Sequence, residues 1–202
     1  MRARFENAGV IPVLIFEDAS HAAPTAGALI DGGLDVLEVA LRTDASWDAL
    51  ADIMKQHPNA VTGVGTVLDR DQMKRAFDMG AAFAVSPGLD PDLVGCARDL
   101  DLFYMPGVAT PSEVMQARAM DLKSLKFFPA EAAGGTAMLK SFISPFSDMS
   151  FCPTGGIGVE NAADYRALKN VFCVGGSWLA MASDMVSGNW QSITDKAKQV
   201  KK

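Results

Sequence analysis

The sequence is poor in cysteine and histidine, and it lacks any long apolar run. Its three cysteines, Cys96, Cys152 and Cys173, share no CxxC spacing and lie inside apolar segments, so we expect free, buried thiols. No histidine or second cysteine stands at metal-ligand spacing, which argues against a metal site. No segment approaches the roughly 20 apolar residues of a membrane helix, and no apolar run follows Arg2 and Arg4 as in a secretory signal. We therefore expect a cytoplasmic protein with no membrane partner.

Basic residues are also outnumbered. The chain carries 18 Lys and Arg against 24 Asp and Glu, a formal net charge of −6, and its basic residues are spread along the sequence. Nucleic-acid-binding proteins gather Lys and Arg on one face, so this distribution argues against a nucleic-acid partner and favours a small substrate. With 202 residues, 49% of them hydrophobic, the chain is expected to form a single domain over residues 1–202, with only 194–202 frayed.

Short apolar runs alternate with longer amphipathic segments along the whole chain. Continuous apolar runs are typical of strands in a parallel sheet whose two faces are both covered. The strand candidates occupy residues 10–16, 36–41, 61–66, 83–87, 102–106, 125–128, 150–153 and 171–174. Helices that begin after an N-cap side chain or at an early proline are predicted over 22–30, 47–56, 71–79 and 112–120.

Such βα units can either close into a barrel or spread into a doubly wound sheet. No G-x-G-x-x-G motif follows the first strand, as it would in a dinucleotide-binding sheet. Polar residues recur instead at the carboxyl ends of several different strands, where a barrel assembles its site. The pattern therefore favours an α/β fold with a single (β/α)8 TIM barrel.

Two charged residues interrupt the apolar strands. Strand alternation places Lys126 and Phe128 on one face, and it places Glu38, Ala40 and Arg42 on one face of an earlier strand. In a barrel the polar face points inward, where desolvation leaves part of the Lys126 amine neutral and able to attack a carbonyl. Glu38 could exchange protons there, and the Arg42 guanidinium could bind a carboxylate. A purely structural ion pair between Glu38 and Lys126 stays open as the alternative.

Glycine pairs follow the last two strand candidates, at Gly155-Gly156 and at Gly175-Gly176 before Ser177. Glycine lets backbone N–H groups approach an anion, and the loops after the last two barrel strands often bind phosphate. Tight turns alone are the alternative. Thr66 and Pro87 also close strands, where they could supply a hydroxyl and a rigid apolar wall, although such residues are usually caps or turns.

These segments together resemble the 2-keto-3-deoxy-6-phosphogluconate (KDPG) and 4-hydroxy-2-oxoglutarate (KHG) aldolase family. The resemblance implies a (β/α)8 barrel of the class I aldolase type, usually a homotrimer, with no metal or dissociable cofactor. It implies that Lys126 forms a Schiff base with the substrate and that Glu38 is the acid and base. The matching segments cover residues 37–43, 65–67, 86–89, 106–111, 125–131, 153–157 and 174–178. The substrate-binding residues that it implies are Arg42 and Thr66 for the carboxylate, Pro87 and Phe128 for the pocket wall, and Gly155, Gly156, Gly176 and Ser177 for the phosphate.

The expected reaction is cleavage of KDPG, a phosphorylated 2-keto acid of the Entner–Doudoroff pathway, to pyruvate and glyceraldehyde 3-phosphate. Two alternatives remain open: an aldolase for KHG or another 4-hydroxy-2-keto acid, and a non-catalytic sugar-phosphate-binding barrel. The chain departs from the family pattern at Ala40, where a threonine is frequent, and this bears on substrate preference. Residues 1–9 also look short for the helix that commonly covers the barrel floor.

Overall fold

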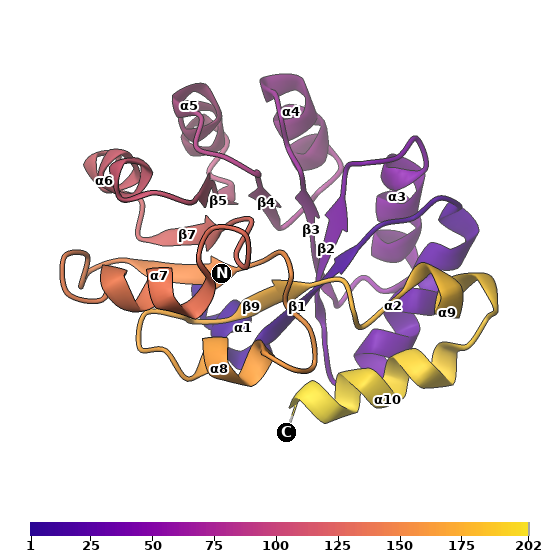
Figure 1. Cartoon of the computed structure of the whole chain (residues 1–202). Helices are drawn as coiled ribbons and strands as arrows, with labels where there is room; N and C mark the ends of the chain where they lie inside the picture. Colours follow the sequence, from indigo (N-terminus) through magenta and orange to yellow (C-terminus); the bar gives the residue numbers. More distant parts are fainter. Residues whose placement is uncertain (202) are drawn as a thin grey trace.

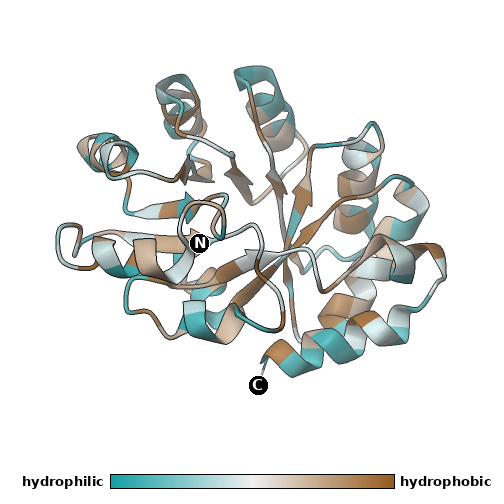
Figure 2. Cartoon of the chain, in the orientation of Figure 1, coloured by the Kyte–Doolittle hydropathy of each residue, from teal (hydrophilic) through white to brown (hydrophobic). Residues whose placement is uncertain are grey.

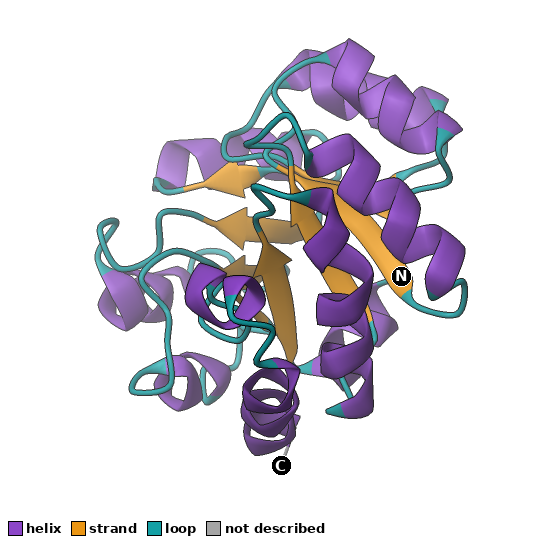
Figure 3. Ribbon diagram, turned by 90° about the vertical axis from the view of Figure 1, so that its right-hand side faces the viewer, coloured by secondary structure: helices purple, strands orange, loops and turns teal. Residues whose placement is uncertain are grey.

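The structure is a computed structural model that describes residues 1–201, with parallel strands at its centre and helices around them (Figures 1 and 3). The strands are β1 (Val10–Leu14), β2 (Val36–Ala40), β3 (Val61–Gly65), β4 (Phe83–Val85), β5 (Phe103–Met105), β6 (Gly107–Val108), β7 (Ser124–Phe127), β8 (Ser150–Pro153) and β9 (Val174–Gly176). The helices are α1 (Arg2–Ala8), the 3-10 turn η1 (Ala19–His21), α2 (Ala22–Asp31), α3 (Ser46–Gln56), α4 (Arg70–Asp78), α5 (Pro91–Asp99), α6 (Pro111–Ala119), α7 (Gly135–Phe142), α8 (Ala162–Arg166), α9 (Ala182–Val186) and α10 (Trp190–Lys201). The predicted alternation of strands and helices is confirmed.

The strands pair in parallel throughout. One sheet has the order β5-β4-β3-β2-β1-β9, and a second has the order β6-β7-β8. Only Pro106 separates β5 from β6, so the chain passes there from the first sheet to the second. A parallel bridge between Thr154 and Gly175 joins the end of β8 to β9. The predicted α/β fold with parallel strands is therefore confirmed, and the carboxyl ends of the strands meet at one edge.

Apolar side chains cover both faces of the strands, which are among the most hydrophobic parts of the molecule (Figure 2). On the outer face, residues such as Leu37 and Val39 join the large core formed with the helices. On the inner face, Val36 and Phe83 join a smaller cluster that also holds Cys152 and Cys173. Burial on both faces explains why the strands appear in the sequence as continuous apolar runs.

The N-terminal segment forms a helix despite its shortness. Phe5 of α1 is completely buried, and its ring packs edge-on against Phe83 at a centroid distance of 4.8 Å. Phe103 and Phe172 lie at 5.6 and 6.4 Å from the same ring. Phe5 therefore supplies the apolar cover at the amino ends of the strands that the length of this segment had put in doubt.

Two sequence expectations are wrong. Of the segment 194–202 expected to be frayed, residues 194–201 belong to α10, where Thr194 donates a hydrogen bond of 2.9 Å to the Ala28 carbonyl of α2. Residue 202 lies outside the described residues. The last strand begins at Val174, and Val171 forms only an isolated bridge to Phe151, because the apolar run starts before the residues that pair with β1. None of the helices in the described chain combines the length and apolarity needed to cross a bilayer.

Replacing Phe5 with alanine should lower the free energy of unfolding by about 3–5 kcal/mol, since it empties a closed aromatic cluster. Urea unfolding followed by circular dichroism measures the change. The control is Phe77→Ala on α4, where the side chain is 41% exposed and its loss should have little effect. Equal losses of unfolding free energy in the two variants would contradict the role of α1 as the apolar cover at the amino ends of the strands.

Candidate active site

Lys126 of β7 and Glu38 of β2 face each other inside the molecule. They are 2% and 4% exposed, and the Lys126 Nζ lies 3.4 Å from the Glu38 Oε1. The two strands belong to different sheets, so the contact spans the space between them. Both side chains therefore lie on the inner face, as strand alternation predicts.

Glycine in β3 makes room for the Glu38 carboxylate. A Cβ atom at Gly65 would lie 2.0 Å from the Glu38 Oε1, which no side chain could tolerate without displacing the carboxylate. At Gly63 the same atom would lie 2.5 Å from the Phe83 ring. In the sequence Gly65 stands out only as part of a segment that matches the family, and its steric role is visible only in the structure.

The ion pair is loose. Charge-assisted N–H···O bonds are typically about 2.7–2.9 Å long, whereas this one measures 3.4 Å. The Nζ also lies 5.1 Å from the centroid of the Phe128 ring, which forms an apolar wall beside it. The amine is therefore held near Glu38 without being clamped, and it can turn toward a carbonyl carbon.

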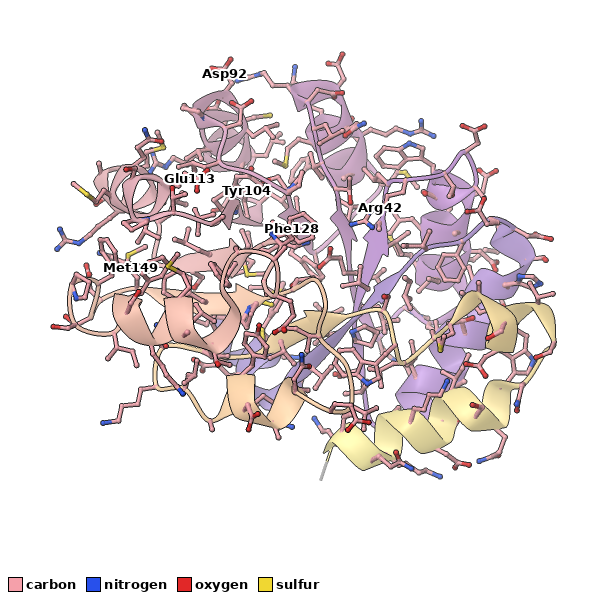
Figure 4. All side chains as sticks on the ribbon, viewed as in Figure 1. Arg42, Asp92, Tyr104, Glu113, Phe128 and Met149 are labelled. Carbon is pink, nitrogen blue, oxygen red and sulfur yellow. The ribbon has the colours of Figure 1, made fainter. Side chains whose placement is uncertain are left out.

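Arg42 and Thr66 meet at the carboxyl ends of β2 and β3. The Arg42 Nε donates a hydrogen bond of 3.0 Å to the Thr66 Oγ1, and Thr66 has a left-handed backbone with φ 61°. Ser46 steadies the Arg42 loop, because its hydroxyl donates to the Ala40 carbonyl at 3.0 Å. Figure 4 shows Arg42 and Phe128 toward the centre of the molecule, whereas Asp92 and Glu113 lie on outer helices. An exposed guanidinium beside a hydroxyl is suited to a carboxylate ligand.

Pro87 is held next to the lysine strand. A Cβ atom at Gly107 would lie 2.2 Å from the Pro87 carbonyl oxygen, and Gly107 is the register partner of Lys126. Behind Pro87, the Ser86 hydroxyl lies 2.6 Å from both the Gly88 carbonyl oxygen and the Tyr104 hydroxyl. Burial raises the pKa of Tyr104 to about 12, so its hydroxyl remains protonated. This support, which joins the end of β4 to β5, has no signal in the sequence.

The glycine residues predicted to bind phosphate gather at the neighbouring strand ends. Gly155 and Gly156 have φ angles of 100° and 76°, which favour glycine. A cavity of about 520 Å³ is lined by Gly156, Ser177 and Glu17 among others. A Cβ atom at Gly155 would lie 3.2 Å from the Phe128 ring, so this group adjoins the wall of the lysine pocket. The Thr154–Gly175 bridge brings the two glycine pairs together.

Cys152 and Cys173 lie in the inner cluster near the ion pair. Cys152 is the register partner of Lys126, and Cys96 is buried elsewhere, so the prediction of free, buried thiols is confirmed for all three. Burial raises the pKa of the Cys173 thiol, and the neighbouring Cys152 and the charge of Glu38 raise it further. Cys173 therefore stays neutral. Among residues 1–201, no His, Cys, Asp and Glu side chains form a group of three or more that could hold a metal ion.

The comparisons with known sequences agree over nearly the whole chain. The model of the family described as "KDPG and KHG aldolase" matches residues 1–196. The chain belongs to this aldolase family. The KHG/KDPG aldolase of Escherichia coli K12 is 45% identical over 94% of this chain and 89% of its own length. The 2-dehydro-3-deoxy-phosphogluconate aldolase of Pseudoalteromonas atlantica is 44% identical over 96% of this chain and 91% of its own length.

Solved structures of family members have the same fold. KDPG aldolase from Legionella pneumophila, with pyruvate captured at low pH as a covalent carbinolamine intermediate, superposes with a TM-score of 0.96. It is 40% identical, over 98% of this chain and 97% of that one. The aldolase of Zymomonas mobilis with 3-phosphoglycerate gives a TM-score of 0.91 at 43% identity, over 98% of this chain and 93% of that one.

Removing one partner of the buried ion pair should destabilise the aldolase more than removing both. Lys126→Met leaves the Glu38 carboxylate without its partner and should cost about 3–5 kcal/mol, whereas Glu38→Leu combined with Lys126→Met should recover most of that loss. Urea unfolding of the single and double variants measures the difference. Arg4→Ala is the control, because Arg4 and its partner Asp35 are 47% and 48% exposed and their bridge should contribute less than about 1 kcal/mol. Purely additive losses would contradict a coupled buried pair.

Proposed function

We propose that this protein is a class I aldolase that cleaves KDPG to pyruvate and glyceraldehyde 3-phosphate. The observation that carries the proposal is the buried Lys126 amine facing the Glu38 carboxylate. Arg42 and Thr66 lie at adjoining strand ends, and the glycine pairs lie at others. A 2-keto acid with a distal phosphate matches this arrangement of an amine, a cation and backbone N–H groups.

Lys126 is the proposed nucleophile. Its neutral amine adds to the C2 carbonyl of the substrate to give a carbinolamine, and Glu38 transfers the proton that lets water leave as the iminium ion forms. The C4 hydroxyl proton then passes to a water molecule as the C3–C4 bond breaks, and the electron pair of that bond moves into the iminium ion to form an enamine. Glyceraldehyde 3-phosphate leaves, the enamine takes a proton at C3, and water releases pyruvate and the free amine. The covalent carbinolamine of the Legionella relative supports this assignment.

The two ends of the substrate would be bound by different chemistry. The Arg42 guanidinium and the Thr66 hydroxyl hold the carboxylate, and Pro87 and Phe128 enclose the keto carbon. Gly155, Gly156, Gly176 and Ser177 hold the phosphate through backbone N–H groups and a hydroxyl. Within residues 1–201 the N–H groups of Gly156 and Ile157 donate no hydrogen bond, which leaves them available to an anion.

The proposed aldolase activity also bears on the closure of the barrel, the need for a cofactor and the oligomeric state. We propose that the two sheets close into a (β/α)8 barrel through Pro106 at one seam and the Thr154–Gly175 bridge at the other. The iminium ion supplies the electron sink, so the reaction would use neither a metal nor a dissociable cofactor. By the family resemblance we propose a cytoplasmic protein that forms a homotrimer. Light scattering of the purified protein measures the molar mass of the assembly and so tests the trimer.

A second candidate function is cleavage of KHG to pyruvate and glyoxylate. It is favoured by the Escherichia coli relative, whose name includes both substrates. The ratio of kcat/KM for KDPG and KHG distinguishes the two activities. A non-catalytic sugar-phosphate-binding barrel would not explain why a buried Lys126 amine faces Glu38.

Incubation with pyruvate and borohydride should attach one reduced pyruvyl group to Lys126, and Lys126→Ala should remove both the adduct and turnover. Intact-mass and peptide mass spectrometry locate the group, and circular dichroism checks that the variant is folded. Lys123→Ala, which removes an exposed lysine paired with Asp148, is the matched control and should still form the adduct. Turnover by folded Lys126→Ala would refute the assigned nucleophile.

Glu38→Gln should lower kcat by about 10²–10⁴-fold, because the amide cannot exchange the protons that dehydration and hydrolysis require. Steady-state assays with KDPG measure the loss. Single-turnover assays should show that the slow step lies in forming or hydrolysing the iminium ion. A kcat close to that of the unmodified protein would show that another group transfers these protons.

A further inference from the structure

The turn that follows β7 is tied to the loop that follows β8. The Ala130 N–H donates to the Thr154 carbonyl at 2.8 Å, and the Glu131 N–H donates to the Gly155 carbonyl at 3.1 Å. The turn after β7 carries Phe128 of the lysine pocket, and the loop after β8 carries the Gly155-Gly156 pair. These backbone bonds fix the spacing between the two regions.

The Glu131 side chain packs directly against the glycine pair. A Cβ atom at Gly156 would lie 2.6 Å from the Glu131 Cγ, so Glu131 occupies the space beside this residue. Its Oε1 accepts a hydrogen bond from the hydroxyl of Tyr165. A Cβ atom at Gly135 would lie 3.2 Å from that hydroxyl and 3.4 Å from the Glu131 Oε1, so the glycine leaves room for the bond.

Tyr165 comes from α8, the helix that follows the same loop and lies below α7 in Figure 1. Its side chain is completely buried, and burial together with the bond to Glu131 raises the pKa of the Tyr165 hydroxyl, which therefore remains a donor. On the other side of the loop, the Asn161 Nδ2 donates to the Gly156 carbonyl at 3.1 Å, and its Oδ1 accepts from the Gly158 N–H at 2.9 Å. The loop is thus braced from both sides.

We propose that Glu131 and Tyr165 are positioning residues that set the preference of this enzyme for phosphorylated substrates, an inference that rests on the proposed function. Glycine pairs are conformationally free, so an unbraced loop must be ordered each time a phosphate binds. The Glu131–Tyr165 bond holds Gly156 in its left-handed conformation beforehand, with its N–H available. Neither side chain has a part in the chemistry at Lys126.

The test compares KDPG with the unphosphorylated substrate KHG. Tyr165→Phe removes only the hydroxyl, and Glu131→Ala removes the packing and the acceptor. Each should raise KM for KDPG by about 10- to 150-fold, the effect of losing a hydrogen bond to a charged group, and leave kcat little changed. KM and kcat for KHG should stay at their original values. Glu131→Gln keeps both the shape and an acceptor oxygen and should restore most of the KDPG affinity.

Thr194→Val is the matched control, since it removes a buried hydrogen bond on α10 and should lower the melting temperature without changing the ratio between the substrates. Equal losses with both substrates, or lower stability with an unchanged KM ratio, would overturn the positioning role. If the unmodified protein cleaves neither substrate, the proposed function fails. Calorimetric titration with glycerol 3-phosphate then tests the positioning role of Glu131 and Tyr165 independently of catalysis. Weaker binding of glycerol 3-phosphate by Tyr165→Phe supports this positioning role, and unchanged binding overturns it.

Discussion

The burial of an ammonium and a carboxylate in an apolar interior is the constraint on which the rest of this structure depends. Taking two charges out of water is costly unless they compensate each other, so Lys126 and Glu38 must be brought together from different sheets. Gly65 leaves space for the carboxylate, and Cys173 stays neutral beside it. A loose pair then keeps the lysine reactive without leaving its charge uncompensated.

Around this pair, the strand ends provide two physically different binding regions. Arg42 with Thr66 offers a charged, forked donor set, whereas the glycine pairs offer neutral backbone donors next to the carboxylate of Glu17. Backbone donors carry only partial charges, so they bind an anion more tightly when their geometry is set in advance and little ordering is needed on binding.

The sequence was most informative where local periodicity decides the structure. Alternation placed Lys126 and Glu38 on the inner face, and the helix predicted over 112–120 is α6, which begins at Pro111 directly after its N-cap Thr110. Contacts between residues far apart in the sequence produce no local periodicity and could not be predicted. Glu131 and Tyr165 meet across 34 positions, and the polar residues of 194–201 look frayed until Thr194 and Ala197 are seen packed against α2. Register likewise depends on the neighbouring strand, which is why the start of β9 was misplaced.

In the proposed reaction, the Lys126 amine bonds to the keto carbon while Arg42 and Thr66 hold the carboxylate. A crystal structure of the protein soaked with pyruvate would show this bond and these contacts. We expect continuous density from the Lys126 Nζ to the pyruvate C2, with the carboxylate against the Arg42 guanidinium and the Thr66 hydroxyl. Pyruvate bound without a covalent bond, or attached to another lysine, would contradict it.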